Sequence, residues 1–160
     1  MGMRNLIWVA ITGLIIAADQ VSKHLIIRYV EYNSFIPVID KFFYITHHEN
    51  KGAAWGILQN RLYILIPLTI VFSIVMGYVL FKTENKMLKF SLSFVLGGAM
   101  GNFIDRISKG RVVDFLDFYF GKYNFPTFNI ADMFIVMGTI ILAVFVLFFY
   151  EKASMAPWGF

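Results

Sequence analysis

The chain has 160 residues, of which 59% are hydrophobic and 15% charged, and its formal net charge is +4. A soluble domain of ordinary composition is about half apolar and about a quarter charged, so this composition favours one compact membrane-embedded domain. The modest charge, with no run of five basic residues, excludes a typical nucleic-acid-binding protein. The absence of cysteine excludes a disulfide framework, a thiol nucleophile and a thiolate metal site.

Four segments are long and apolar enough to cross a bilayer, which takes about 20 helical residues. They cover about residues 6–29, 62–81, 87–105 and 130–149. Backbone groups in lipid must find hydrogen-bond partners within their own segment, so each segment is expected to be a helix. No convincing cleavage site follows the first segment, which indicates a retained helix and not a removed signal peptide. We therefore expect an all-α membrane protein with four transmembrane helices, forming a single domain over residues 1–160.

Two long connections, about residues 31–61 and 106–129, must lie on the same side of the membrane when the chain crosses four times. The first contains FFYITHHE, whose alternation and β-branched residues predict short strands. A small extracytoplasmic β element is therefore expected from the first connection. The second connection is expected to place Asp114 in a loop.

The distribution of Lys and Arg bears on the orientation of the chain. The side that holds both termini carries Arg4, Lys82, Lys86, Lys89 and Lys152. The long-connection side carries Lys41, Lys51, Arg61, Lys109, Arg111 and Lys122. Positive charges normally gather on the cytoplasmic side, so this count alone does not place the termini in the cytoplasm.

Polar residues interrupt the third segment in a helical pattern. Gly98, Asn102 and Asp105 fall on one face of a helix, and Arg106 lies one turn from Asn102. Close helix packing could explain the G-x-x-x-G motif at 97–101. It does not explain the polar side chains, which are costly in lipid without partners.

Two further polar pairs stand in the first and fourth segments. Asp19 and Lys23 are four residues apart and could simply neutralise each other as a structural ion pair. Asn129 and Asp132 resemble a capping box at a helix start, where the helix dipole also favours a carboxylate. A functional interpretation is favoured because a second carboxylate, Asp114, is expected near the same membrane surface. Two carboxylates in a partly dry site share a proton and can activate water while protonating a leaving group.

The histidines do not suggest a metal site. His47 and His48 fall in a predicted strand with no second set of ligands at metal-binding spacing. We interpret them as residues at the rim of a site, and we expect neither a metal nor another cofactor.

Five motifs occur in a characteristic order and spacing. They are Asp19-Gln20, NKGAAWG at 50–56, GGAMGNFIDR at 97–106, VVDF at 112–115 and FNIAD at 128–132. Together they resemble the lipoprotein signal peptidase family, bacterial signal peptidase II. The resemblance covers about residues 5–150, and the final segment EKASMAPWGF has no counterpart.

This resemblance implies an intramembrane aspartic endopeptidase that removes signal peptides from diacylglyceryl-modified prolipoproteins, cutting just before the lipid-modified cysteine. It implies that Asp114 and Asp132 form the catalytic pair. The implied supporting or substrate-binding residues are Asp19, Lys23, Asn50, Gly52, Asn102, Asp105, Arg106 and Asn129. The implied partners are the lipid-modified substrate and membrane lipid, with the chain working as a monomer. Family topology places both termini in the cytoplasm and the active site near the extracytoplasmic face of the bacterial cytoplasmic membrane.

Two other classes of protein fit parts of this pattern. A small proton or ion conductor could use Asp19, Asp105 and Asp132 as relay groups, but it would need polar residues through the full membrane depth. A non-enzymatic assembly subunit would leave Asp114 and Asp132 unexplained. The clustering of polar residues in one membrane half favours the peptidase.

Overall fold

The computed structural model describes residues 3–52 and 57–150, and the side chains from residue 5 onward within these ranges. Within these ranges there are four helices, α1 Met3–Tyr29, α2 Leu62–Lys82, α3 Lys86–Lys109 and α4 Ile130–Phe148. Four strands span β1 Phe35–Ile39, β2 Phe43–Asn50, β3 Val112–Phe120 and β4 Tyr123–Asn124. Every one of these helices is long and apolar enough to cross a membrane, which confirms the predicted fold class.

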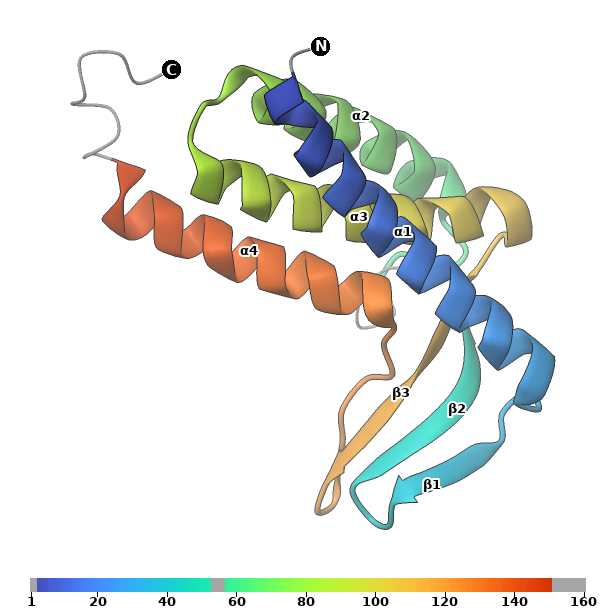
Figure 1. Cartoon of the computed structure of the whole chain (residues 1–160). Helices are drawn as coiled ribbons and strands as arrows, with labels where there is room; N and C mark the ends of the chain where they lie inside the picture. Colours follow the sequence, from blue (N-terminus) through green and yellow to red (C-terminus); the bar gives the residue numbers. More distant parts are fainter. Residues whose placement is uncertain (1–2, 53–56, 151–160) are drawn as a thin grey trace.

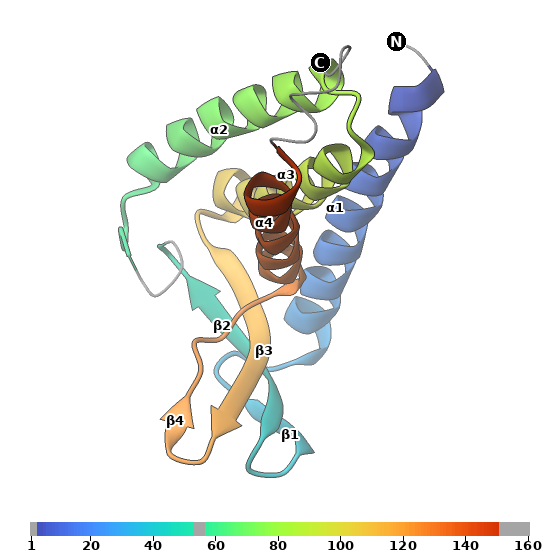
Figure 2. The same ribbon diagram turned by 90° about the vertical axis from the view of Figure 1, so that its left-hand side faces the viewer.

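Helix α3 lies at the centre of the bundle, with α1, α2 and α4 packed around it (Figures 1 and 2). Its most apolar window is 56% buried, compared with 11–17% for the other three helices. The start of α1, the α2–α3 turn and the end of α4 lie at one end of the bundle, and the sheet lies at the other (Figure 1). A central helix that touches three neighbours is where polar side chains can find partners away from lipid.

Local sequence explains where α3 begins and ends and how closely it packs. Asn85 caps its first turn by accepting a hydrogen bond from the Leu88 N–H at 3.0 Å. Gly110 ends it in the left-handed conformation (φ 71°), which glycine adopts without a steric penalty. Between these ends, Gly98 faces α4 so closely that an added Cβ would collide with the carbonyl oxygen of Ala131. The two glycines of the G-x-x-x-G motif, at 97 and 101, face α1 just as closely, so they serve the close helix packing that the motif predicted.

The sheet is antiparallel in the order β1-β2-β3-β4, so it joins the two long connections. Strand β2 confirms the strand predicted for FFYITHHE. The expectation of a loop around Asp114 is wrong, because Asp114 lies in β3, directly opposite His48 of β2. Helix α3 continues to Lys109, a turn beyond the expected end of the third membrane span. The sequence VVDFLDFYF is rich in β-branched and aromatic residues, which favour a strand. Pairing with β2 gives the backbone N–H and C=O groups of this strand their hydrogen-bond partners.

Replacing Gly98 with alanine should weaken the bundle, because the added methyl group has no room between α3 and the backbone of α4. Overpacking of this kind costs about 1–3 kcal/mol. The matched control is Gly77→Ala in α2, where an added Cβ meets nothing within 4 Å. Thermal unfolding of both variants in detergent tests this expectation, and equal midpoints would contradict it.

Candidate active site

Asp114 and Asp132 come from different elements and meet at one asparagine. Asn129, which directly precedes α4, donates from Nδ2 to Asp114 Oδ1 at 2.6 Å. Its backbone N–H donates to Asp132 Oδ2 at 3.2 Å. The structure therefore brings together the two carboxylates that the sequence singled out, although one comes from a strand and the other from a helix.

Asp132 is oriented by the start of α4. The capping box with Asn129 is formed, since the Asp132 N–H donates to Asn129 Oδ1 at 3.0 Å and the reciprocal bond is also present. The cap uses only one carboxylate oxygen. The other, Oδ1, accepts a hydrogen bond from Asn102 Nδ2 at 2.8 Å. The capping interpretation and the site interpretation of Asp132 are thus compatible.

Asp114 is almost fully buried, and its second carboxylate oxygen accepts a hydrogen bond from Asn50 Nδ2 at 3.1 Å. Burial, and secondly the nearby charge of Asp132, raise the pKa of Asp114 to about 7. Hydrogen bonds from Asn129 and Asn50 and the charge of Lys23 act in the opposite direction on this pKa. Asp114 therefore holds its proton up to neutral pH.

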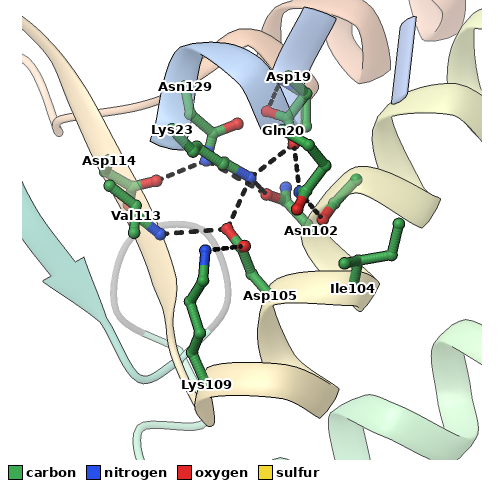
Figure 3. A network of polar contacts seen from close by, with 12 residues as sticks. Asp19, Gln20, Lys23, Asn102, Ile104, Asp105, Lys109, Val113, Asp114 and Asn129 are labelled. Carbon is green, nitrogen blue, oxygen red and sulfur yellow. Dashed lines mark hydrogen bonds and ion pairs between the residues drawn. The ribbon is translucent and has the colours of Figure 1, made fainter. Parts of the chain in front are cut away.

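A buried charge cluster of Lys23, Asp19 and Asp105 lies near Asp114 (Figure 3). The Lys23 ammonium contacts Asp19 Oδ2 at 2.8 Å and Asp105 Oδ2 at 3.0 Å, and all three side chains are fully buried. The predicted Asp19–Lys23 ion pair is present, but Asp105 is a second partner that the sequence did not indicate. Lys109 contacts the other oxygen of Asp105 at 2.8 Å. Its spacing of four residues from Asp105 on a helix is the signal that could have identified it.

Asp19 also ties α1 to the start of α4. Its Oδ1 accepts a hydrogen bond from the Ala131 N–H at 2.9 Å, in the first turn that carries Asp132. Gln20 was not predicted as a site residue, yet its Nε2 donates to the Gly101 carbonyl at 3.0 Å and to Asp19 Oδ2 at 3.2 Å. The sequence signal that could have identified Gln20 is its amide side chain directly next to Asp19, a carboxylate within a membrane span.

Arg106 secures the part of the first connection that reaches the site. Its Nη2 donates to the Gly52 carbonyl at 3.0 Å, and the Gly52 N–H donates to Asn50 Oδ1 at 2.8 Å. A Cβ on Gly52 would lie 2.7 Å from the Ile57 carbonyl oxygen, so a side chain does not fit there. The rest of NKGAAWG, residues 53–56, lies outside the described residues.

The pair opens into a cavity of about 1110 Å³. Its polar lining residues include His48, Asn50, Asn102, Arg106, Asp114 and Asp132. Its apolar lining residues include Leu68 and Phe72 of α2 and Met133, Val136 and Met137 of α4. His47 instead bonds through Nδ1 to the Val30 carbonyl at 3.0 Å. Within the described ranges, no group of three or more His, Cys, Asp or Glu side chains could hold a metal ion.

Comparison with known proteins identifies the family. The family model described as signal peptidase (SPase) II matches residues 11–148. The chain belongs to this family. It is similar to a solved structure described as a bacterial membrane enzyme, with a TM-score of 0.83 and 35% identity over 94% of this chain and 91% of that chain. A second structure with the same description gives a TM-score of 0.81 and 36% identity over 89% and 93% of the two chains.

Membership of the signal peptidase II family makes this chain a peptidase of lipoprotein maturation with several membrane spans. The alternative of a proton or ion conductor is not favoured. The family assignment does not by itself identify the residues that perform the reaction. That question depends on the geometry of the pair.

Replacing Asp19 with alanine should destabilise the protein, because the buried Lys23 loses one of its two carboxylate partners and α4 loses a contact at Ala131. Breaking a buried ion pair costs about 3–5 kcal/mol, and the remaining bond to Asp105 favours the lower end. The control is Asp40→Ala at an exposed turn, which should change little. Unfolding midpoints of the purified variants measure the difference, and equal loss in both would contradict a structural role for Asp19.

Asp114 should make stability depend on pH with a definite sign. Its raised pKa means that, between about pH 4 and about pH 7, the folded protein keeps a proton that the unfolded chain has released. The contribution is fully present below the unfolded pKa and is lost as the pH rises through about 7. Asp114→Asn cannot titrate, so its melting temperature relative to the wild type should rise from about pH 4 to about pH 8. A falling difference would contradict the assignment.

Proposed function

We propose that this signal peptidase is an aspartic endopeptidase whose catalytic pair is Asp114 and Asp132. The observation that carries the proposal is that Asn129 bonds to both carboxylates at the polar end of the cavity. Two carboxylates held together in a mostly buried site are the arrangement that shares one proton. The bond cut is the one before the lipid-modified cysteine of a prolipoprotein, as the family's activity implies.

The cavity suits such a substrate. Its polar end lies at the junction of the sheet with α3 and α4, and its apolar walls come from α2 and α4. Helix α2 carries no charged residue from Leu62 to Phe81. An apolar signal peptide and acyl chains can therefore be held along these walls while the scissile peptide bond reaches the carboxylates.

The chemical step follows from the different settings of the two carboxylates. Asp132 stands in the first turn of α4, where N–H groups and the helix dipole favour its ionised form, so it acts as the base. It takes a proton from a water molecule as the water oxygen attacks the scissile carbonyl carbon. Asp114, protonated up to about pH 7, donates its proton to the carbonyl oxygen. Collapse of this intermediate breaks the C–N bond, and the departing amine takes up a proton from the pair.

The other site residues position this pair and the substrate. Asn102 and Asn129 hold the carboxylates through amide hydrogen bonds. Arg106 and Gly52 hold the turn that carries Asn50 against Asp114. Their alanine variants should slow the reaction but leave both proton-transfer groups, Asp114 and Asp132, in place.

We also propose that the end of the bundle where α1 begins and α4 ends faces the cytoplasm and that the sheet and site face outward. The excess of basic residues on the outer side then meets lipid headgroups. One of them, Arg111, is paired with Glu49 at 2.8 Å. Since α3 is already surrounded by three helices and the site draws on one chain, a monomer is sufficient for activity.

Asp114→Asn and Asp132→Asn should each abolish cleavage of a lipid-modified precursor peptide by purified enzyme in detergent. Each keeps the shape of the side chain but removes a proton-transfer group, which by itself contributes about 10²–10⁴-fold to the rate. The wild-type rate should follow a bell-shaped pH profile, falling above about pH 7 as Asp114 loses its proton.

The control for this experiment is Asp40→Asn, which removes an exposed carboxylate that does not line the cavity. It should cleave at the wild-type rate, and a chelator should leave the wild-type rate unchanged. Full activity in Asp114→Asn, or inhibition by a chelator that added metal reverses, would overturn the aspartic mechanism.

A further inference from the structure

The asparagines around the proposed catalytic pair are all oriented by groups that can only donate hydrogen bonds. These donors are the Gly52 N–H for Asn50 Oδ1 (2.8 Å), the Asp132 N–H for Asn129 Oδ1 (3.0 Å) and the Lys23 ammonium for Asn102 Oδ1 (2.9 Å). A carboxamide has an acceptor oxygen on one side and a donor NH₂ on the other. When its oxygen is held by an obligate donor, its NH₂ must point the other way.

In each case the NH₂ group points at a carboxylate of the pair. Asn102 donates to Asp132 Oδ1, and Asn129 and Asn50 donate to the two oxygens of Asp114. A reversed amide would place its oxygen against a carboxylate oxygen, which is repulsive. The orientation of the amides therefore decides whether the pair is surrounded by donors or by acceptors.

Lys23 differs from the other two orienting groups because it is a side chain. The backbone N–H groups are fixed by the fold, whereas the Asn102 oxygen is held by two side chains, the buried Lys23 ammonium at 2.9 Å and, at the longer distance of 3.2 Å, Asn129 Nδ2. Lys23 is fully buried and is not among the residues that line the cavity. It therefore acts on the reaction only through its neighbours and through its charge.

We propose that Lys23 is a positioning residue for the reaction, which holds the Asn102 amide with its NH₂ toward Asp132 and supplies the positive charge that favours an ionised carboxylate in the pair. This inference rests on the proposed function of Asp114 and Asp132. It assigns to the buried charge cluster a role beyond stability.

The charges around Lys23 and the pair determine the expected effect on pH dependence. Those facing Lys23 or its carboxylate partners are Asp19 of α1, Asp105 and Lys109 of α3, Asp114 of β3 and Asp132 of α4. Beside the pair lie also Arg106 of α3 and His48 of β2. Lys23 contacts both the Asn102 amide and the carboxylates of Asp19 and Asp105, whereas Lys109 contacts Asp105. Removing the Lys23 charge favours protonated carboxylates, so both limbs of the bell-shaped profile should move to higher pH.

The test compares Lys23→Met with Lys109→Met in the full-length enzyme. Both substitutions remove an ammonium from Asp105, but only the first also removes the charged donor from Asn102 Oδ1. Lys23→Met should lower kcat, per folded enzyme, by about tenfold or more, shift the pH profile upward by about one unit and leave KM unchanged. Lys109→Met should lose stability and keep the wild-type pH profile. Equal pH profiles for the two variants would overturn the proposal.

Because Lys23→Met leaves Asp19 and Asp105 without their shared cation, Asn102→Asp provides a second route. It keeps an oxygen for Lys23 and presents an acceptor, not a donor, to Asp132, so kcat should again fall by about tenfold or more. A wild-type kcat and pH profile in Asn102→Asp would overturn the proposal even if Lys23→Met does not fold.

The Asp→Asn variants of the pair separate the two proposals. Cleavage by Asp114→Asn and Asp132→Asn would refute the catalytic pair itself. Inactivity of those two variants together with a wild-type pH profile in folded Lys23→Met would refute only the role of Lys23.

Discussion

The buried ammonium of Lys23 is the contact on which the rest of the site depends. A charge with no exposed surface inside a membrane bundle is tolerated only when carboxylates and hydrogen bonds surround it. Lys23 has two carboxylates, from α1 and from α3, and the Asn102 oxygen as a third acceptor. The ammonium that joins α1 to α3 therefore also contacts Asn102, which donates a hydrogen bond to Asp132. Lys23 therefore serves both the stability of the bundle and the proposed reaction. For this reason the buried charge cluster lies next to Asp114 and Asp132 and not at a remote part of the bundle.

The pair itself is surrounded by neutral amides, and this choice has a physical reason. A cation in direct contact with each carboxylate would hold both ionised and leave no proton to donate. Amides from Asn50, Asn102 and Asn129 satisfy the buried oxygens while leaving burial strong enough to raise the pKa of Asp114. The cations Lys23 and Arg106 act one step further away, through Asn102 and through the turn at Gly52. The proposed catalytic pair can thus keep one proton and one charge in the same small volume.

Much of this arrangement was predictable from the sequence, for identifiable reasons. The four spans follow from length and hydropathy, and the cap at Asn129 follows from residue type and spacing. Only some partners of Asp19 and Asp105 were predictable. A spacing of four residues indicates a contact within one helix, such as Asp19–Lys23, but it does not indicate a contact between α1 and α3, such as Lys23–Asp105. Asp114 was expected in a loop because the pairing of β3 with β2 joins residues more than sixty positions apart. The position of His48 opposite Asp114 could not be predicted for the same reason.

Helix α2 explains why so polar a site can still serve an apolar substrate. It contributes no charged group to the site, and its buried residues are only Leu65 and Leu80. It packs on α3 but not closely on α4, so Leu68 and Phe72 are left to line the cavity opposite Met133 and Val136. The helices that carry the charges, α1, α3 and α4, are instead locked together by glycine contacts and the Lys23 cluster. Close packing is thus found where the carboxylates are held within hydrogen-bond distance, and apolar surface is left open on the side that we propose accommodates lipid-modified chains.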